Sequence, residues 1–389
     1  MREVTSRERM LAAIGCAEPD HVPCSFMLFN ALRERSRDYP HFVEQQVELG
    51  LDAYVQVPPR PPRWQSDHRD LYGLPVTHDE RVQVVEWAEE EAGERLLVKE
   101  YRTPAGTLRV EVRRTQDWPH GEHVPFLDDY LIPRSRKFLV SGPEDLEPLS
   151  FLLVPPKPQE VAAFQEQAAQ LKALAARHGL LTVGGWGVGA DLLGWILGLQ
   201  NLVFLPYDRP QFLRELLSLV SAWNKERMRV VLAAGVDLYV KRAWYENLDH
   251  FTPTSWAQFI QPILRSEVEL AHEHGARFGY IITSNCQPLL PLIAEAGVDV
   301  VIGVDPHLWD LRAAKDVARG RMCLWGGVNG HLTVEQGSEE EVRQEVRQAI
   351  EILGAGGGFI LSPVDNVRED TPRAWANVHA LLDEWRKSW

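Results

Sequence analysis

The sequence predicts an α/β fold, a (β/α)8 or TIM barrel that carries an antiparallel β insertion after its second strand. Eight short apolar runs each end in small, polar or aromatic residues, and a helical pattern follows nearly all of them. Eight strand-then-helix units are typical of this barrel, which places its chemistry at the carboxyl ends of the strands. The predicted strands are residues 21–28, 52–57, 181–186, 238–245, 277–283, 298–305, 322–328 and 358–363.

Length, charge and cysteine content limit the functions that this chain could have. Its 389 residues suit one barrel with insertions, and its formal net charge of −14 argues against nucleic acid or an anionic membrane as a partner. The cysteines show no metal-type spacing, so we expect neither disulfides nor structural zinc. No apolar run reaches transmembrane length, and residues 1–12 resemble a helix more than a signal peptide. We therefore expect a cytoplasmic protein.

The chain begins with a predicted helix. Thr5 and Glu8 have the spacing of a capping box, in which a hydroxyl and a carboxylate each accept a backbone N–H, and the helix continues to Ile14. We divide the chain into three parts that together make one catalytic domain. They are residues 1–62, with this helix and the first barrel strands, 63–152, a β-rich insertion, and 153–389, the remainder of the barrel.

The insertion has the residue alternation of antiparallel strands. The alternation covers residues 81–90, 95–101 and 108–113, and a tight turn is predicted at 103–107. Long insertions on the active-site face of a barrel are often lids. The sequence leaves two interpretations open: a lid over the barrel mouth, or a surface decoration that could meet a partner.

Helix signals are regular in the rest of the chain. A helix is predicted over residues 159–178, and Thr252 and Thr371 each stand before a proline, as N-cap residues do. Ser338 opens a further capping box, and the glycines at 354–358 end that helix and lead into the last strand. Because these glycines precede a strand and not a helix, they do not predict a phosphate site.

Three segments resemble one protein family. Thr5–Pro23, Pro288–Asp299 and Gly356–Pro372 are similar to the uroporphyrinogen decarboxylase (URO-D) superfamily. Its members are heme-pathway decarboxylases and cobalamin-linked methyltransferases, all on (β/α)8 barrels. The resemblance implies a barrel enzyme that is closer to the methyltransferase-like members than to true uroporphyrinogen decarboxylases.

The chain departs from the decarboxylase branch at two places. That branch has an arginine pair just after its first strand, whereas the matching stretch Met27–Leu32 has leucine at both positions. The late histidine of the branch falls near Asp365, whose charge would repel a polycarboxylate substrate. The resemblance therefore does not imply uroporphyrinogen decarboxylation.

The chain also departs from the zinc patterns of the methyltransferase branch. The His-x-Cys and late cysteine of one pattern fall on Ile281, Thr283 and a position near Val364. The Glu, Glu and His of the other fall on Glu246, Gln261 and a position near Ile282. Zinc takes three or four N, S or O ligands, so one carboxylate is not a site. We assign no metal ligand, although zinc binding stays open.

Three side chains near strand ends are the candidate catalytic residues. Glu246 follows the fourth predicted strand and Asp365 the eighth. A carboxyl group in a partly apolar site can hold a proton at neutral pH and donate it to a leaving oxygen. His331 is the third candidate, as a proton carrier. The alternative for the carboxylates is a structural salt bridge with one of the neighbouring cations Lys241, Arg242 and Arg368.

Other side chains at strand ends are candidate substrate contacts. Aromatic rings supply flat apolar walls for an aromatic or corrinoid-sized ligand, and asparagines orient a ligand without adding charge. The glycines at 184–189 let backbone approach a ligand closely, but their spacing is not that of a dinucleotide site. The candidates are Phe29, Asn30, Trp186, Asp191, Lys241, Trp244, Tyr245, Asn285, Asp305, His307, Asn329 and Asn366.

The leading hypothesis is a methyltransferase-like enzyme. It would pass a methyl group from a small methylated substrate, for example an aromatic one, to a corrinoid protein. No segment resembles a cobalamin-binding module, so we expect the chain itself to bind no cofactor and a partner to bring the corrinoid. A second copy, in a homodimer, is another candidate partner. The alternatives are a decarboxylase of a small or tetrapyrrole-like carboxylic acid, with Lys241 or Arg242 holding a carboxylate, and a non-catalytic ligand-binding barrel.

Overall fold

A parallel β-sheet of seven strands forms the centre of the molecule. The computed structural model describes residues 4–59 and 74–389. The strands pair in chain order, and every neighbouring pair is parallel. They are β1 (Tyr54–Val57), β6 (Leu181–Gly187), β7 (Leu238–Arg242), β8 (Arg277–Ile281), β9 (Val300–Val304), β10 (Cys323–Asn329) and β11 (Phe359–Val364).

The first predicted strand, residues 21–28, is not a regular strand. It makes one parallel bridge, between Cys24 and Leu361 of β11, and on its other side the Asp52 N–H donates to Cys24 O at 2.8 Å. The segment therefore lies between β11 and the residues before β1. Its ladder stops for a physical reason: Pro23 has no N–H, and the Cys24 N–H donates to the Asp52 side chain instead of a strand carbonyl.

Two predicted strands also end earlier than expected. β7 ends at Arg242 instead of residue 245, because the N–H groups of Trp244 and Tyr245 turn to the Asp191 carboxylate. β8 ends at Ile281 instead of residue 283. The other strands differ from the predicted bounds by one or two residues at either end.

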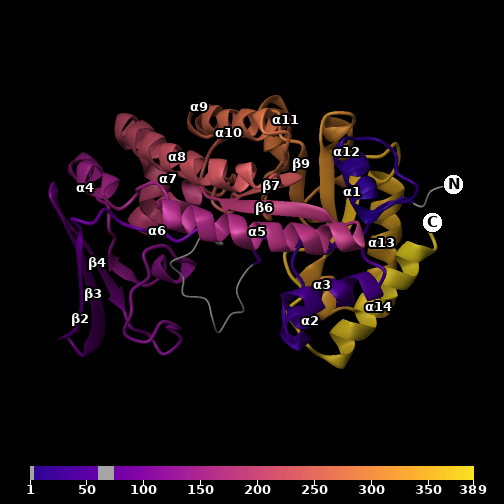
Figure 1. Cartoon of the computed structure of the whole chain (residues 1–389), viewed down its shortest axis with the longest axis horizontal. Coiled ribbons are helices and arrows are strands. Elements are labelled where there is room, and N and C mark those ends of the chain that lie inside the picture. The colour runs from indigo at the N-terminus through magenta and orange to yellow at the C-terminus, as the bar shows by residue number, and fades with distance from the viewer. Residues whose placement is uncertain (1–3, 60–73) are drawn as a thin grey trace.

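Helices cover the outer face of the parallel sheet (Figure 1). The predicted N-caps Thr5, Thr252, Ser338 and Thr371 all accept a backbone N–H, and Thr5 and Ser338 form complete capping boxes. The α-helices are α1 (Ser6–Ile14), α2 (Asn30–Arg35), α3 (Tyr39–Glu48), α4 (Leu146–Ser150), α5 (Pro158–His178), α6 (Ala190–Leu197), α7 (Leu199–Asp208), α8 (Pro210–Ala233), α9 (Pro253–Phe259), α10 (Gln261–Glu273), α11 (Leu290–Glu295), α12 (Leu311–Ala318), α13 (Glu339–Leu353) and α14 (Pro372–Arg386). Shorter helical turns are η2 (Asp129–Leu131), η3 (Pro143–Asp145), η4 (Gln287–Leu289) and η5 (Gly330–Glu335). In the part of the chain that is described, no helix has the length and apolar character needed to cross a bilayer.

The interior of the curled parallel sheet is apolar and is capped by α1. Leu181, Val240 and Ile302 come from alternate positions of their strands and pack with Met10 and Ile14 of α1. The Arg7 N–H donates to Gly179 O just before β6, so α1 lies at the amino ends of the strands. The carboxyl ends are at the opposite end of the molecule.

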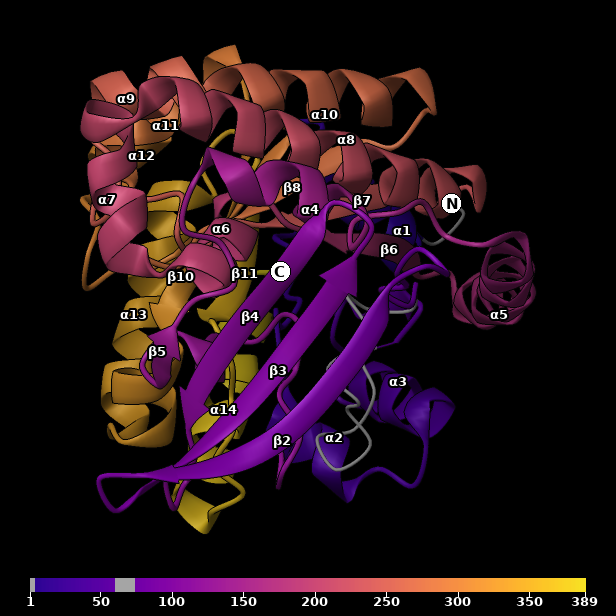
Figure 2. The same ribbon diagram turned by 90° about the vertical axis from the view of Figure 1, so that its left-hand side faces the viewer.

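An antiparallel sheet of four strands is present, separate from the parallel sheet. It consists of β2 (Gln83–Glu91), β3 (Glu94–Thr103), β4 (Gly106–Arg113) and β5 (Ser135–Lys137), and it lies between β1 and β6 in the chain. Figures 1 and 2 place this sheet at the end of the molecule opposite α1. The insertion is therefore on the side of the carboxyl ends of the parallel strands.

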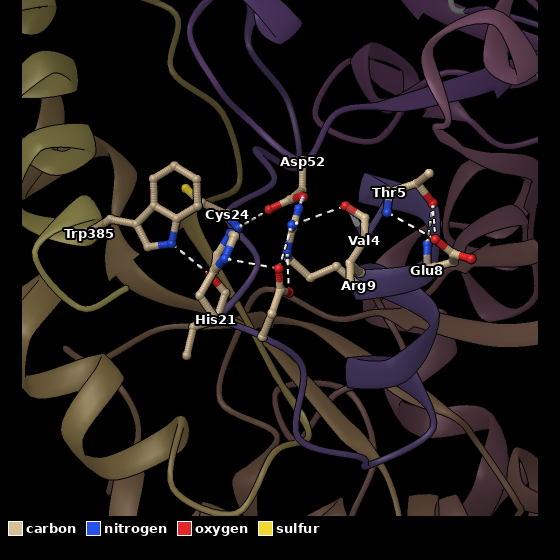
Figure 3. A network of polar contacts seen from close by, with 10 residues as sticks. Val4, Thr5, Glu8, Arg9, His21, Cys24, Asp52 and Trp385 are labelled. Atoms are coloured by element: carbon tan, nitrogen blue, oxygen red, sulfur yellow. Dashed lines mark hydrogen bonds and ion pairs between the residues drawn. The ribbon is translucent and has the colours of Figure 1, made fainter. Parts of the chain in front are cut away.

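A partly buried ionic network joins α1 to the segment beside β11 (Figure 3). Arg9 Nη1 lies 2.6 Å from Asp52 Oδ1, and Arg9 Nε lies 2.7 Å from Asp20 Oδ1. Asp52 also accepts the Cys24 N–H, and the Trp385 indole N–H donates to Val22 O at 2.7 Å. Burial raises the pKa of Asp52 while Arg9 opposes that rise. The network holds the segment that fills the gap between β11 and β1.

We expect Arg9→Met to destabilise the fold strongly. The substitution leaves the Asp52 carboxylate buried without its cation, and such a loss costs about 3–5 kcal/mol. Urea unfolding followed by circular dichroism measures the change. The control is Arg37→Met, because Arg37 is 72% exposed in its pair with Asp38. Equal unfolding free energies for the two variants would contradict the role of the network.

Candidate functional site

A small apolar cavity lies inside the parallel sheet. Its volume is about 30 Å³, which holds roughly one water molecule. The Tyr54 hydroxyl donates to Met27 O at 2.6 Å and the Trp325 indole N–H to Ser25 O at 2.8 Å, so both polar atoms are engaged by backbone. The lining residues are Met27, Tyr54, Gln56, Val183, Gly184, Gly185, Val240, Ile281, Ile302 and Trp325.

Lys241, a predicted substrate contact, lies behind the sheet. Val240 lines the cavity, so the next side chain along β7 points to the opposite face. Lys241 Nζ lies 2.9 Å from Glu267 Oε2 on α10 and 3.3 Å from Glu246 Oε1, and all three side chains are 1% exposed. Burial alone lowers the pKa of Lys241, but the two carboxylates raise it above its ordinary value. Lys241 is therefore a buried cation that two protein carboxylates neutralise.

Glu246, a predicted proton donor, belongs to the same buried group. Its Oε1 accepts the Ala190 N–H at 2.9 Å, and its Oε2 accepts the Tyr280 hydroxyl. With Lys241 these contacts join the segment after β6, the segment after β7 and β8. The structure places Glu246 outside the lining of the apolar cavity. Its predicted role as an acid stays a prediction.

Asp191 and Arg242 form a second buried pair, at the carboxyl end of β7. Asp191 is fully buried at the start of α6, and its Oδ2 lies 2.9 Å from Arg242 Nε. The Trp244 ring stacks on the Arg242 guanidinium, with 3.8 Å from Cζ to the ring centroid. Burial raises the pKa of Asp191 to about 6, and Arg242 opposes that shift. Three predicted contacts, Asp191, Trp244 and Tyr245, thus meet around one arginine.

The insertion supplies a carboxylate to this arginine. Asp129, in η2, lies 2.8 Å from Arg242 Nη2 through each of its oxygens. Its Oδ1 also accepts the Tyr245 hydroxyl and the Trp195 indole N–H, both at 2.8 Å. Sequence analysis missed Asp129 and Trp195. No local signal marks them, because the hydrogen bonds of the Asp129 side chain join residues that are at least 66 positions apart.

Asp305, Asn329 and His307 gather at the ends of β9 and β10. The Asn329 amide donates to Asp305 Oδ2 at 2.9 Å, and the Asn329 N–H donates to Glu345 Oε2 at 2.8 Å. His307 Nε2 lies 2.7 Å from the other oxygen of Glu345, and its ring is partly exposed. The cluster joins two neighbouring strand ends to α13.

Asp365, Asn366, Asn30 and His331 lie after the last strands. The Asn30 N–H donates to Asn366 Oδ1 at 3.1 Å, which joins α2 to the end of β11. Asp365 has φ +67°, a left-handed conformation that is uncommon for a residue with a side chain but that aspartate adopts more readily than most residues. His331 Nδ1 lies 2.9 Å from Glu335 Oε2, and its side chain is about half exposed.

Three of the predicted substrate contacts are not found in the polar clusters at the strand ends. Phe29 is buried against Phe26 and Trp375, with ring centroids 4.8 and 5.5 Å away, so it is part of the core. Asn285 is exposed. The backbone of Trp186 lies in β6, but its side chain lies outside what the structure describes.

The positions that match the zinc patterns do not fit a zinc ion. Ile281 lines the apolar cavity, Ile282 is fully buried, and the Gln261 amide donates to Leu292 O at 3.0 Å. The thiols of Cys286 and Cys323 are free and buried. Within residues 4–59 and 74–389, no three His, Cys, Asp or Glu side chains lie close enough together to hold a metal ion.

Comparisons with known proteins agree with this architecture. The family model described as uroporphyrinogen decarboxylase (URO-D) matches residues 124–388. A methyltransferase from Methanosarcina mazei aligns over 99% of both chains, with 18% identity and a TM-score of 0.62, which supports the fold. A putative vitamin-B12-independent methionine synthase from Listeria monocytogenes aligns over 58% of this chain and 69% of its own, with 14% identity and a TM-score of 0.38. No curated protein sequence matches the chain.

Because the pKa of Asp191 is raised in the folded protein, we expect its contribution to the free energy of unfolding to decrease as pH rises from 3.8 to about 6. The folded protein keeps this proton up to about pH 6, whereas the unfolded chain releases it near the ordinary value of 3.8. The contribution of protonated Asp191 to the free energy of unfolding is complete below the pKa of the unfolded chain. Between the unfolded and the folded pKa it falls by roughly 1.4 kcal/mol per pH unit, and it is lost once pH has risen through the folded pKa.

Urea unfolding between the two pKa values measures this slope. Asp191→Asn should lose that part of the slope, and Asp316→Asn, at a site that is 76% exposed, should keep it. The same slope in all three proteins would show that Asp191 titrates elsewhere.

Proposed function

This chain belongs to the uroporphyrinogen decarboxylase family, and on that premise we propose that it is a methyltransferase-like enzyme. In this proposal it takes a methyl group from a small methylated substrate and passes it to a corrinoid that a partner protein carries. The observation that supports this reaction most is that both cations at the end of β7 already have two carboxylate partners each. The cavity between the strands is also apolar.

The charge balance at β7 disfavours an acidic substrate. A site for a carboxylate needs a cation whose charge is not already balanced. Lys241 lies between Glu246 and Glu267, and Arg242 lies between Asp191 and Asp129. With each carboxylate ionised, each group carries a formal excess of one negative charge, which would repel a further anion. The charge balance at β7 therefore favours methyl transfer over the decarboxylase alternative.

The apolar cavity, with a volume of about 30 Å³, suits a group of the size of a methyl. Its aromatic walls are Tyr54 and Trp325, and the polar atoms of both face backbone carbonyls. Trp244 packs against the same apolar interior from the end of β7. A neutral, flat, methylated molecule is therefore the substrate class that we propose.

Asp365 is our proposed proton donor to the leaving heteroatom. It follows β11 at the carboxyl end of the sheet, and its backbone is in the left-handed conformation. We assign Glu246 a positioning role instead, because its two oxygens engage Ala190, Lys241 and Tyr280.

Exposed apolar side chains at the carboxyl end suit a protein partner. Phe204 and Tyr207 on α7 and Leu308 and Leu332 in the segments after β9 and β10 are each more than half exposed. A contiguous exposed apolar patch is typical of an interaction surface, and we propose that these four side chains contribute to one. The corrinoid of such a partner, when bound, supplies the nucleophile that accepts the methyl group.

Reduced free cobalamin and a panel of aromatic methyl ethers provide a direct test. The expected result is loss of the reduced cobalamin spectrum together with formation of a phenol, seen by mass spectrometry. Carbon dioxide release from an aromatic acid in the absence of cobalamin would instead identify a decarboxylase. Saturable binding of these compounds without any turnover would identify a ligand-binding barrel.

We expect Asp365→Asn to lower kcat for demethylation by about 100-fold or more, because it removes the proposed proton donor. The loss should shrink for substrates whose leaving phenol has a low pKa, since these need less protonation. Glu351→Gln is the control, because Glu351 is 77% exposed on α13. Wild-type turnover by Asp365→Asn across the series would remove Asp365 from the mechanism.

A further inference from the structure

Three hydrogen-bond donors from separate segments converge on one carboxylate at the carboxyl end of the sheet. The Trp195 indole N–H of α6, Arg242 Nη2 of β7 and the Tyr245 hydroxyl after β7 each donate to Asp129 Oδ1 at 2.8 Å. Arg242 Nη2 also reaches Oδ2 at 2.8 Å. A cation with two neutral donors around one oxyanion is the arrangement that proteins use to bind carboxylates.

The parallel-sheet part of the molecule holds these donors in place. Asp191, which is fully buried, lies 2.9 Å from Arg242 Nε, and its other contacts are the N–H groups of Trp244 and Tyr245. The rings of Trp244 and Trp195 lie 3.8 and 4.8 Å from the Arg242 guanidinium carbon. The arginine is thus fixed by groups that do not depend on Asp129.

The carboxylate itself belongs to the insertion. Asp129 is in η2, between β4 and β5, and its side chain is 41% exposed. The Asp128 carboxylate accepts the Tyr130 N–H at 2.7 Å, which shapes the turn that carries Asp129. Two hydrogen bonds nearby join the same two parts of the molecule: the Val140 N–H donates to Ile196 O, and the Arg209 guanidinium donates to Ser141 O.

We propose that Arg242, Tyr245 and Trp195 form a carboxylate-binding cradle, and that Asp129 occupies it as an internal ligand that latches the insertion over the carboxyl ends of the sheet. The insertion is then a lid, in agreement with its place in Figures 1 and 2. The cradle accepts other small carboxylates when Asp129 is absent. This inference is independent of methyl transfer.

Hydrogen–deuterium exchange of the full chain tests both halves of the proposal. In Asp129→Ala we expect exchange to become roughly tenfold faster or more in two peptides, since charged hydrogen bonds of this kind are lost. One, the insertion peptide, contains residues 129–131. The other, the mouth peptide, contains residues 243–246, which directly follow β7 at the carboxyl end of the sheet. Millimolar acetate should restore slow exchange in the mouth peptide, because it refills the cradle, but not in the insertion peptide, because it is not joined to the lid.

Two further variants make the result specific. Asp117→Ala removes an ion pair with Arg134 that stays within the insertion, so both peptides should exchange as in the wild type and should not respond to acetate. Asp129→Asn keeps the size of the side chain but loses its charge, and it should open the insertion as Asp129→Ala does. Unchanged exchange of the insertion in both Asp129 variants would overturn the latch. A mouth peptide in Asp129→Ala that does not respond to acetate would overturn the cradle.

Discussion

The pairing of buried charge at the end of β7 is the constraint on which the carboxyl end of this molecule depends. Lys241 and Arg242 are consecutive, so the strand directs them to opposite faces, and each is neutralised by two carboxylates. Removal of one member of such a group leaves an uncompensated charge. The carboxylates come from α6, α10, the segment after β7 and the insertion, so these two cations fix the positions of four separate segments.

This constraint divides the carboxyl end into regions with different chemistry. Charged groups around β7 are saturated by the protein itself, whereas the cavity between the strands is apolar and lies next to aromatic side chains. Asp365 directly follows the last strand, β11. The proposed methyl transfer needs this division, because an apolar group and a proton donor must act side by side without a competing anion site.

The order of strands and helices could be predicted from the sequence because its signals are local. Apolar runs, capping boxes and threonine–proline pairs placed β6 to β11 and the starts of α1, α9, α13 and α14 near their observed bounds. The first predicted strand was wrong because Asp52, distant in the chain, takes the N–H of Cys24. For the site, residue types at the strand ends identified Asp191, Trp244 and Tyr245, which do meet, but could not separate them from Lys241, which points the other way.

The sequence by itself determined the alternation of strands and helices, the antiparallel insertion and the family, since periodicity and short motifs act over a few residues. Only the tertiary structure decided which charges are already paired and that Asp129 reaches Arg242, 113 positions away in the chain. The physical reason is that the energy of a charge in a protein depends on burial and on the distance to other charges. Neither quantity is encoded in a local pattern, because both arise when distant segments pack together.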